Sequence, residues 1–360
     1  MGFLKSVNYP ITVCLSLLLS VGIIVISSSS TILAIQQASF AIFGLLIYFF
    51  IASSDYRTLT NLIRPSYLLI ILLLILVFIL GVETRGSIRW IPLGPVNIQP
   101  SEFAKPVIIL FLAGFWSNRI VTWKNILKSF LWLLPVLGLV FKQPDLGTTI
   151  TLGAIWLGFI FAAGISLKKG LVLLLTLVLV IPLILVGLAD YQKDRLTSFL
   201  SPEQDPLGLG YNIIQSTIAI GSGEFIGRGL GQGTQSRLQF LPEFRTDFIF
   251  ASLAEELGFL GSVTILLIYL FLISYSLKIA SRSVDFFGFL LSIGVAVMII
   301  FQTAVNIGMS VGLVPITGVT LPLISYGGSS LVATLISFGL LASVAKFKRP
   351  IDVSSVGGYN

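Results

Sequence analysis

Histidine is absent from this 360-residue sequence, and cysteine occurs only once. Without histidine, the chain can form neither a Ser-His-Asp triad nor a histidine-ligated metal site, and it has no histidine general base. The single cysteine, Cys14, excludes an intramolecular disulfide and a cysteine-based metal cluster. Any acid–base chemistry therefore falls to Asp, Glu, Lys or Tyr.

Charged residues are also scarce. They make up 10% of the chain, against roughly 25% in an average soluble domain, while hydrophobic residues make up 56%. Continuous apolar runs near twenty residues long recur throughout, and each is long enough to cross a hydrocarbon core of about 30 Å. Because these runs do not alternate with polar residues, they predict helices and not a β-barrel. We predict an all-α integral membrane protein, a single polytopic domain over 1–360, whose ten transmembrane helices lie at about 11–26, 33–52, 67–82, 103–118, 127–142, 148–165, 170–189, 247–279, 286–306 and 329–345.

The basic residues predict the orientation of these helices. The net charge of +7 does not indicate nucleic-acid binding, because Lys and Arg are scattered in ones and twos between apolar runs. If the N-terminus is cytoplasmic, thirteen of the 22 basic residues but only three of the fifteen acidic residues fall in inner segments. The positive-inside rule therefore predicts two cytoplasmic termini and an acidic extracytoplasmic face.

Three outer segments are too distinctive to be simple connections. The largest, about 190–246, is a predicted extracytoplasmic loop between helices 7 and 8 that contains an amphipathic stretch at 211–220 and a glycine-rich run at 221–235. The segment 81–102 carries Arg85 and Arg89, and the segment 306–328 carries Ser325. Loops of this kind on a rigid helical scaffold commonly carry function.

Asp247 is the first candidate for chemistry. It precedes an apolar run that begins at about Leu257, which predicts a position at the water-facing entrance of that helix, roughly 15 Å above the run at about 1.5 Å rise per residue. Carboxylates beside hydrocarbon are costly and usually face a cavity or a partner. Glu255 and Glu256 lie two turns further along the predicted helix, and for both a structural role against backbone donors or arginines is the favoured interpretation.

Two further motifs combine polar residues with helix starts. Glu102 and Lys105, three residues apart after a predicted Ser101 cap, share one helix face. They form either an ion pair that holds the helix in place or part of a polar floor near Asp247, and the two roles are compatible. Asp145 opens another helix, where turn formation and capping compete with a functional role.

The glycine-rich run invites comparison with phosphate-binding loops. It matches neither a P-loop nor a dinucleotide fingerprint, and no predicted strand precedes it. Arg228, Arg237 and Arg245 nearby remain candidates to receive a lipid-linked diphosphate, against the simpler interpretation of solvated arginines on a mobile loop.

Taken together, these motifs resemble one family. The runs QPSEFAK (99–105), KQPDLGT (142–148), DPLGLGYNIIQSTIAIGSG (205–223), GTQSRLQFLPEFRTDFIFASLAEELGF (233–259) and NIGMSVGLVPITGVTLPLISYGGSSL (306–331) are similar to the shape, elongation, division and sporulation (SEDS) family. GTQ ahead of FLPE resembles the RodA elongation branch more than the FtsW division branch. Two residues depart from the pattern: Arg245 replaces a common histidine, and Glu224 replaces a usual glycine.

The resemblance implies a ten-helix glycosyltransferase of the bacterial plasma membrane. It implies polymerisation of lipid II into peptidoglycan, with a class B penicillin-binding protein (a PBP2-like transpeptidase) and other elongation-complex proteins as partners. The family's essential aspartate falls on Asp247, and its supporting acid and base fall on Glu102 and Lys105. The other candidate substrate-binding residues are Arg85, Arg89, Asp145, Arg228, Gln235, Thr246 and Ser325.

Joining an α-linked diphosphate sugar into a β-linked polymer inverts the anomeric centre. One carboxylate acting as a base on the acceptor hydroxyl suffices for this reaction. Arginines, or a divalent cation such as Mg²⁺ or Mn²⁺, would neutralise the departing diphosphate, although the sequence has no metal-binding signature. The competing hypotheses are a lipid II flippase and a scaffold without activity. Clustering of acids on one face favours chemistry, because a transporter should show polar residues on both sides of the midplane.

Overall fold

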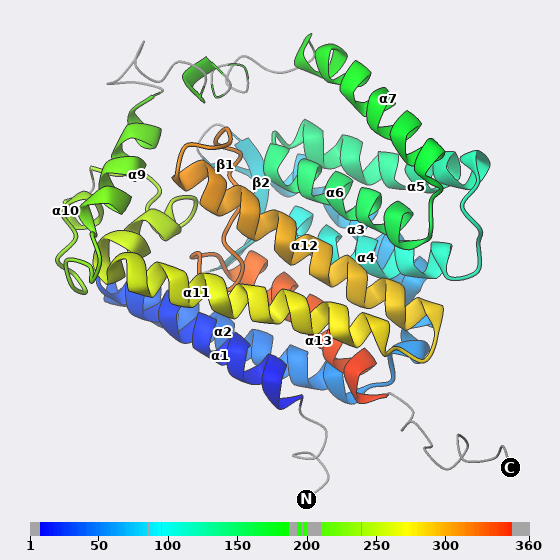
Figure 1. The fold of residues 1–360 in the computed structure, drawn as a ribbon, viewed down its shortest axis with the longest axis horizontal. Coiled ribbons are helices and arrows are strands. Elements are labelled where there is room, and N and C mark those ends of the chain that lie inside the picture. The colour runs from blue at the N-terminus through cyan, green and yellow to red at the C-terminus, as the bar shows by residue number, and fades with distance from the viewer. Residues whose placement is uncertain are drawn as a thin grey trace, which may run out of the picture.

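The computed structural model describes residues 8–84, 87–94, 96–186, 193, 195, 197–199, 210–238 and 240–347. Long helices lie beside one another and run back and forth between two ends of the molecule (Figure 1). In chain order the elements are α1 (Tyr9–Ser27), α2 (Thr31–Ser53), η2 (Tyr56–Leu62), α3 (Ile63–Leu80), β1 (Val82–Thr84), β2 (Ser87–Leu93), β3 (Val96–Ile98), α4 (Pro100–Trp116), α5 (Trp123–Lys142), α6 (Leu146–Ala162), α7 (Leu167–Val186), α9 (Tyr211–Ser222), α10 (Thr234–Arg237), α11 (Ile249–Ser281), α12 (Phe286–Ser310) and α13 (Gly328–Lys346).

In the described residues a helix overlaps each of the ten predicted ranges, and residues 187–189 of the seventh range lie outside them. Among the described residues, seven helical stretches are long and apolar enough to cross a membrane, namely α1, α2, η2 with α3, α5, α11, α12 and α13. Helix α6 is a shorter apolar helix, and α4 has 17 residues and carries buried charges. The chain is therefore a multi-pass membrane protein, with support for seven of its ten predicted spans. Part of the predicted loop 190–246 lies outside the described residues, and its described part contains α9 and α10.

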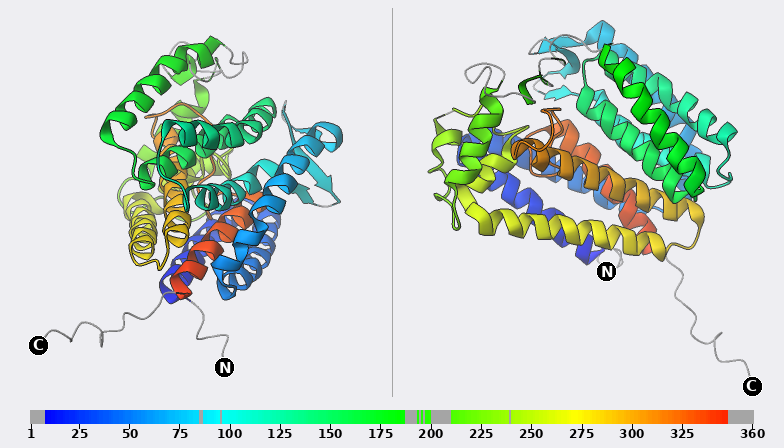
Figure 2. Two further views of the ribbon diagram at one scale, coloured as in Figure 1. Left: turned by 90° about the vertical axis from the view of Figure 1, so that its right-hand side faces the viewer. Right: turned by 45° about the horizontal axis from the view of Figure 1, so that its top comes forward.

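The loops gather at two ends of the bundle, which Figure 2 shows from two further sides. We call the end that carries the strands, α9 and α10 the outer end, and the opposite end, which carries η2, the inner end, following the predicted orientation. The start of α1 and the last turns of α2 and α13 lie together at the inner end: the Thr12 hydroxyl is 2.9 Å from the Tyr48 hydroxyl, and Lys346 Nζ donates to the Ser53 carbonyl at 3.2 Å. Sequence segments predicted to share one side of the membrane therefore do share one end of the molecule.

Helix starts follow ordinary capping chemistry. The side chains of Asn8, Ser30, Thr122, Asp145 and Asp285 each accept a hydrogen bond from a backbone amide in the first turn of the helix that follows. Such caps satisfy amides that would otherwise be unpaired near hydrocarbon.

Asp285 also ties the inner end together. It accepts from the Tyr56 hydroxyl at 2.7 Å and from Arg57 Nε at 3.0 Å. Partial burial acts to raise the pKa of Asp285, but the Gly288 amide, the Tyr56 hydroxyl and Arg57 together lower it below its usual value. The carboxylate therefore stays charged and links η2 to the start of α12.

The prediction of an all-α fold missed a small sheet at the outer end. Strands β1, β2 and β3 form a three-stranded antiparallel sheet in sequence order, with Leu93 paired to Val96 across a tight turn. Gly94 in this turn has φ = 66°, a conformation that glycine adopts without strain. The strands are rich in β-branched and aromatic residues, but a run of three to seven residues is too short to show a clear alternating pattern.

Helix α11 is broken at Gly258, where φ is 67° and ψ is −165°. The glycine-rich loop crosses the helix at this break. Arg228 N and Gly229 N donate to the carbonyls of Glu255 and Glu256 above the break, and Phe259 N and Leu260 N donate to the carbonyls of Glu224 and Phe225 below it. The loop 224–229 therefore splints the two parts of α11 through backbone hydrogen bonds.

We expect Gly258→Ala to destabilise the protein strongly. A Cβ at Gly258 would lie 2.2 Å from the Gly227 amide nitrogen, and the backbone conformation is one that only glycine readily adopts. The loss should reach about 3 kcal/mol, measured as a fall in the melting temperature of purified protein in detergent. Gly138→Ala is the matched control, because nothing lies within 4 Å of a Cβ there and alanine favours a helix. Equal melting temperatures for the two variants would contradict the proposed role of the break.

Candidate functional site

Asp247 lies at the outer end, immediately ahead of α11. The predicted span started at about 247, and α11 starts at Ile249, so Asp247 lies just ahead of the helix that carries Glu255 and Glu256. Asn306 of α12, which is fully buried, fixes the backbone here: its Nδ2 donates to the Asp247 carbonyl at 2.9 Å and to the Val319 carbonyl at 2.7 Å. A single amide side chain thus joins the aspartate to the segment before α13.

Further hydrogen bonds hold the neighbours of Asp247 against the same segment. Ser325 donates to the Thr246 carbonyl at 2.7 Å and accepts from the Leu321 amide at 2.8 Å. The Tyr326 amide donates to the Arg245 carbonyl at 2.8 Å. Ser325 was predicted as a substrate-binding candidate, but in the structure its hydroxyl is hydrogen-bonded to two backbone groups next to Asp247. Thr246 is also engaged locally, since its hydroxyl donates to the Glu243 carboxylate at 2.9 Å.

The side chain of Asp247 approaches Gly318. A Cβ on Gly318 would lie 3.7 Å from Asp247 Oδ2 and 3.8 Å from Arg195 Nη1, so the carboxylate and a guanidinium flank the same glycine. Arg195 also donates to the Ile316 carbonyl at 3.4 Å. In the sequence, Arg195 is only one of several charged residues in the outer loop. Its proximity to Gly318 depends on tertiary structure and could not be predicted from the sequence. The site therefore combines a half-buried carboxylate with a cation.

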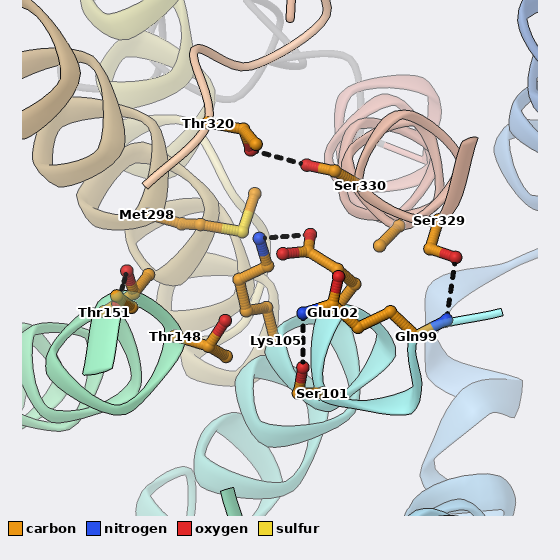
Figure 3. Close-up of polar contacts among 12 residues, drawn as sticks. Gln99, Ser101, Glu102, Lys105, Thr148, Thr151, Met298, Thr320, Ser329 and Ser330 are labelled. Carbon is orange, nitrogen blue, oxygen red and sulfur yellow. Dashed lines mark hydrogen bonds and ion pairs between the residues drawn. The ribbon is translucent and has the colours of Figure 1, made fainter. Parts of the chain in front are cut away.

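Glu102 and Lys105 form an ion pair of 2.7 Å inside the bundle, with 7% and 1% of their surfaces exposed. Figure 3 shows the pair surrounded by side chains from α4, α6, α12, α13 and the segment before α13, among them Thr148, Thr151, Met298, Thr320 and Ser330. The Thr320 and Ser330 hydroxyls are 2.8 Å apart. The predicted pairing of Glu102 with Lys105 is confirmed, and the pair lies where four elements meet.

The predicted cap by Ser101 is wrong. The structure places Gln99 at the cap position of α4, and Ser101 Oγ instead donates to Asp145 Oδ2 at 2.8 Å. Gln99 Nε2 donates to the same oxygen at 3.0 Å, while Asp145 Oδ1 accepts from the Thr148 amide at 3.1 Å. Asp145 therefore caps α6, as predicted, and also joins the starts of α4 and α6. Its two oxygens are occupied by structural hydrogen bonds.

The segment 317–320 connects these two polar clusters. A Cβ on Gly147 of α6 would lie 2.8 Å from the Thr317 carbonyl, so the first turn of α6 packs directly on this segment. Gly318 approaches Asp247, and Thr320 contacts Ser330 near the buried ion pair. The Asp247 site and the Glu102–Lys105 pair therefore lie on opposite parts of one short segment, held by different partners.

The arginine candidates are engaged elsewhere. Arg89 donates to the carbonyls of Gln143 and Pro144, at 3.0 Å for the first, and so fastens the sheet to the start of α6. Arg228 donates to the Ser222 carbonyl at 3.1 Å, and Arg245 donates to the Ser29 hydroxyl at 2.8 Å. Arg85 lies outside the described residues. Arg89, Arg228 and Arg245 thus brace the outer end, whereas Arg195 lies near Asp247 at Gly318. The side chain of the candidate Arg237 is not among those that the structure describes.

Glu255 has the structural role that the sequence favoured. It is fully buried and accepts hydrogen bonds from the Gln235 and Ser236 amides, at 2.9 and 3.1 Å, and from the Ser236 hydroxyl at 2.9 Å. Gln235 therefore contributes its backbone to this clamp. Glu256 accepts from the Ser28 hydroxyl at 2.6 Å, which ties α11 to the end of α1.

Metal binding finds no support in the described residues, which contain no group of three or more His, Cys, Asp or Glu side chains able to hold a metal ion. The site is therefore a carboxylate–guanidinium arrangement at the outer end, built on a backbone fixed by Asn306 and Ser325. Such a site can accept a proton and can receive a negatively charged group.

Comparison with known proteins identifies the family to which this chain belongs. A family model for FtsW, RodA and SpoVE, described as "Cell cycle protein", matches residues 4–350. The chain belongs to this family. The FtsW/RodA/SpoVE family is the one that the motifs of the sequence resemble, so the resemblance is confirmed. Asp247, Glu102 and Lys105 of this chain all lie within the residues that the family model matches.

Relatives from several branches of the FtsW/RodA/SpoVE family are similar to the chain over most of their length. Stage V sporulation protein E of Bacillus subtilis is 40% identical, over 92% of this chain and 95% of the relative. Peptidoglycan glycosyltransferase MrdB of Escherichia coli is 41% identical, over 86% and 85%. A probable peptidoglycan glycosyltransferase FtsW of Pseudoalteromonas translucida is 37% identical, over 94% and 89%.

Solved structures agree with this assignment. A chain from a study of how a peptidoglycan synthase complex coordinates polymerization and crosslinking has a TM-score of 0.82 and 34% identity, covering 95% of this chain and 99% of that one. RodA of Thermus thermophilus has a TM-score of 0.72 and 29% identity, covering 95% and 98%. The fold of the FtsW/RodA/SpoVE family is therefore shared along nearly the whole chain.

Proposed function

We propose that this chain is a peptidoglycan glycosyltransferase that polymerises lipid II at the extracytoplasmic face of the bacterial plasma membrane during cell-wall elongation. The observation that carries the proposal is the carboxylate of Asp247 beside Arg195 at the outer end of the bundle. Relatives named for this activity cover most of the chain.

In the proposed reaction, Asp247 acts as a general base. It takes the proton from the 4-hydroxyl of the acceptor sugar while the hydroxyl oxygen forms a bond to the anomeric carbon of the donor. The bond from that carbon to the diphosphate breaks on the opposite side, and the electron pair leaves with the lipid diphosphate. The anomeric configuration is thereby inverted without a covalent enzyme intermediate.

Arg195 is the described cation best placed to receive the diphosphate. Its Nη1 and Asp247 Oδ2 lie 3.8 and 3.7 Å from the position that a Cβ on Gly318 would occupy. A guanidinium can donate two parallel hydrogen bonds to phosphate oxygens and so stabilise the developing negative charge. Mg²⁺ or Mn²⁺ would supply similar neutralisation, and the described residues form no cluster of His, Cys, Asp or Glu that would hold such an ion.

The Glu102–Lys105 pair supports the site indirectly in this proposal. Both of its residues are on α4, and side chains of α6, α12 and α13 and of Thr320 surround it (Figure 3). Removing either charge would leave the other buried without its partner, which would disturb the segment that Gly318 belongs to. In this proposal the pair therefore helps to hold the segment 317–320 next to Asp247 and does not touch the reacting atoms.

The proposed partner is a class B penicillin-binding protein of the elongation complex. One matching structure comes from a complex that couples polymerization to crosslinking. In the proposal, the partner shifts the outer loop 190–246 and the adjacent helices toward a conformation open to lipid II, and it does not contribute a catalytic residue.

Activity in detergent separates the polymerase from a flippase. Detergent micelles have no two compartments, so a flippase has no net reaction there, whereas a polymerase converts lipid II into glycan chains. We expect the purified protein to produce polymer, to produce more with a class B penicillin-binding protein, and to resist moenomycin, which targets a different glycosyltransferase fold. Polymer would be detected by gel electrophoresis of labelled lipid II.

The same preparation in vesicles supplies the opposing test. If the protein and its partner formed no polymer in detergent but moved lipid II between leaflets, the enzyme proposal would be abandoned for transport. The Asp247→Asn variant is the control, since polymer that persists in that variant at the wild-type rate comes from a contaminating enzyme or from another residue.

The proposed orientation is tested by cysteine labelling in intact cells. We expect a cysteine at Gln215, on α9, to react with a membrane-impermeant maleimide from outside, and one at Lys168, at the start of α7, to react only after permeabilisation. Cys14 is buried and should contribute little background. The reverse pattern would place Asp247 in the cytoplasm and exclude polymerisation on the outer face.

A further inference from the structure

The glycine-rich loop presents large apolar side chains away from the protein. Phe225 and Ile226 are 61% and 78% exposed, and Leu230 is 51% exposed. The hydrophobic cluster under the outer end, which includes Leu241 and Phe248, does not include them. These side chains are unusual for a loop, because burying them in the neighbouring core would be favourable by about 1.5–3 kcal/mol each.

The backbone prevents these side chains from turning inward. The loop is hydrogen-bonded on both sides of the Gly258 break, and Gly227 and Gly229 have φ angles of 88° and 97°. The backbone of the loop is therefore fixed where it crosses α11. The side chains of Phe225 and Ile226, which we call the Phe225–Ile226 tip, point away from the helix bundle.

The exposed tip is continuous with the outward surface of α11. The rings of Phe225 and Phe259 stack with centroids 5.8 Å apart. Below them, an exposed apolar stripe continues along α11 through side chains that include Leu260, Leu267, Leu270 and Phe271. In a membrane-spanning helix, such a stripe is the surface that faces hydrocarbon.

The length of α11 sets the height of the tip. From Phe259 to Ser281 the helix has 23 residues, or about 34 Å at about 1.5 Å per residue, against a hydrocarbon thickness of about 30 Å. Lys278 and Arg282 mark the inner boundary. Phe259, and with it Phe225 and Ile226, therefore lies at the outer hydrocarbon boundary, while exposed Glu224 and Arg228 flank the tip on the polar side.

We propose that the Phe225–Ile226 tip inserts into the outer leaflet of the lipid bilayer and anchors the loop 224–231 at the membrane surface. The anchor holds the outer loop at a fixed height, because the same loop is hydrogen-bonded to the carbonyls of Glu255 and Glu256, and the Glu255 carboxylate clamps α10. This inference concerns lipid contact and holds whether or not the proposed glycosyltransferase activity is correct.

Environment-sensitive fluorescence in nanodiscs tests the proposal. A single cysteine at position 226 (Ile226→Cys, in a Cys14→Ser background) is labelled with an NBD dye, and the discs contain lipids spin-labelled either near the ester group or near the chain end. We expect blue-shifted emission, quenched more strongly by the shallow label. Leu267→Cys, further down α11, is the depth control and should be quenched more by the deep label. Gln232→Cys, at an exposed polar position of the same loop, should show water-like emission.

Two results would overturn the proposal. The first is emission at position 226 that matches position 232 and is not quenched by either lipid. The second is emission that becomes apolar only after a class B penicillin-binding protein is added, which would make the tip a protein-docking surface. If Cys14→Ser fails to fold, the buried Cys14 stays in place and the labelled wild-type chain supplies the background signal.

Discussion

Replacing Asp247 with Asn should reduce lipid II polymerisation by about 10²–10⁴-fold, the usual contribution of a general base. The amide cannot take the proton of the acceptor hydroxyl, but it has nearly the same shape as the carboxylate. The backbone of residue 247 is held by Asn306 through its carbonyl, so the substitution leaves that hydrogen bond in place. Initial rates of polymer formation by purified protein, at equal amounts of folded protein, are the measurement.

Asp285→Asn is the matched control for this experiment. It removes a carboxylate from the inner end, where Asp285 links η2 to α12, far along the helices from Asp247. We expect some loss of stability and little loss of polymerisation. If Asp247→Asn kept the wild-type rate, or if both variants lost activity equally, Asp247 would not be the base.

Lys105→Met should destabilise the protein by about 3–5 kcal/mol, the usual result of leaving a buried charge without its partner. Glu102 would keep its carboxylate in a place where it has 7% of its surface exposed. Adding Glu102→Gln should recover part of this loss, because the double variant has no unpaired charge. Melting temperatures of the two single variants and the double variant in detergent complete the cycle.

The sign of the coupling decides the interpretation. A double variant less destabilised than the sum of the single ones means that the two side chains interact in the folded protein. Additive effects would mean that the 2.7 Å pair contributes nothing as a pair. Polymerisation by the double variant then separates the roles: activity close to wild type would show that the pair acts through folding and not through the reaction.

Much of the fold follows from local pattern. Long apolar runs predict helices because hydrocarbon leaves the backbone no other hydrogen-bond partners, and all ten predicted ranges contain one. The cap at Asp145 and the structural role of Glu255 were also predictable, since each depends on a short polar side chain beside free amides.

The remaining features depend on contacts between distant segments. The Ser101–Asp145 hydrogen bond joins residues 44 positions apart, and Asn306 lies 59 positions from Asp247. Neither distance leaves a periodic trace in the sequence. Arg195 is similar: its charge is visible, but its approach to Gly318 is a product of the folded chain. The break in α11 could have been suspected from Gly258, yet its cause is the loop that crosses it.

Because the loop 224–229 bridges the break at Gly258, the thickness of the bilayer should affect the orientation of the outer end of the protein. A helix longer than the hydrocarbon layer usually responds by tilting. A flexible hinge at Gly258 would absorb such a tilt. The loop 224–229, however, is hydrogen-bonded to α11 on both sides of the break, so we expect the angle between the two parts of the helix to stay fixed. Tilting of the lower helix must therefore turn the loop 224–229, and with it the clamp at Glu255 that holds α10. We therefore expect lipids of different acyl-chain length to change the orientation of the outer loop without any change of residue.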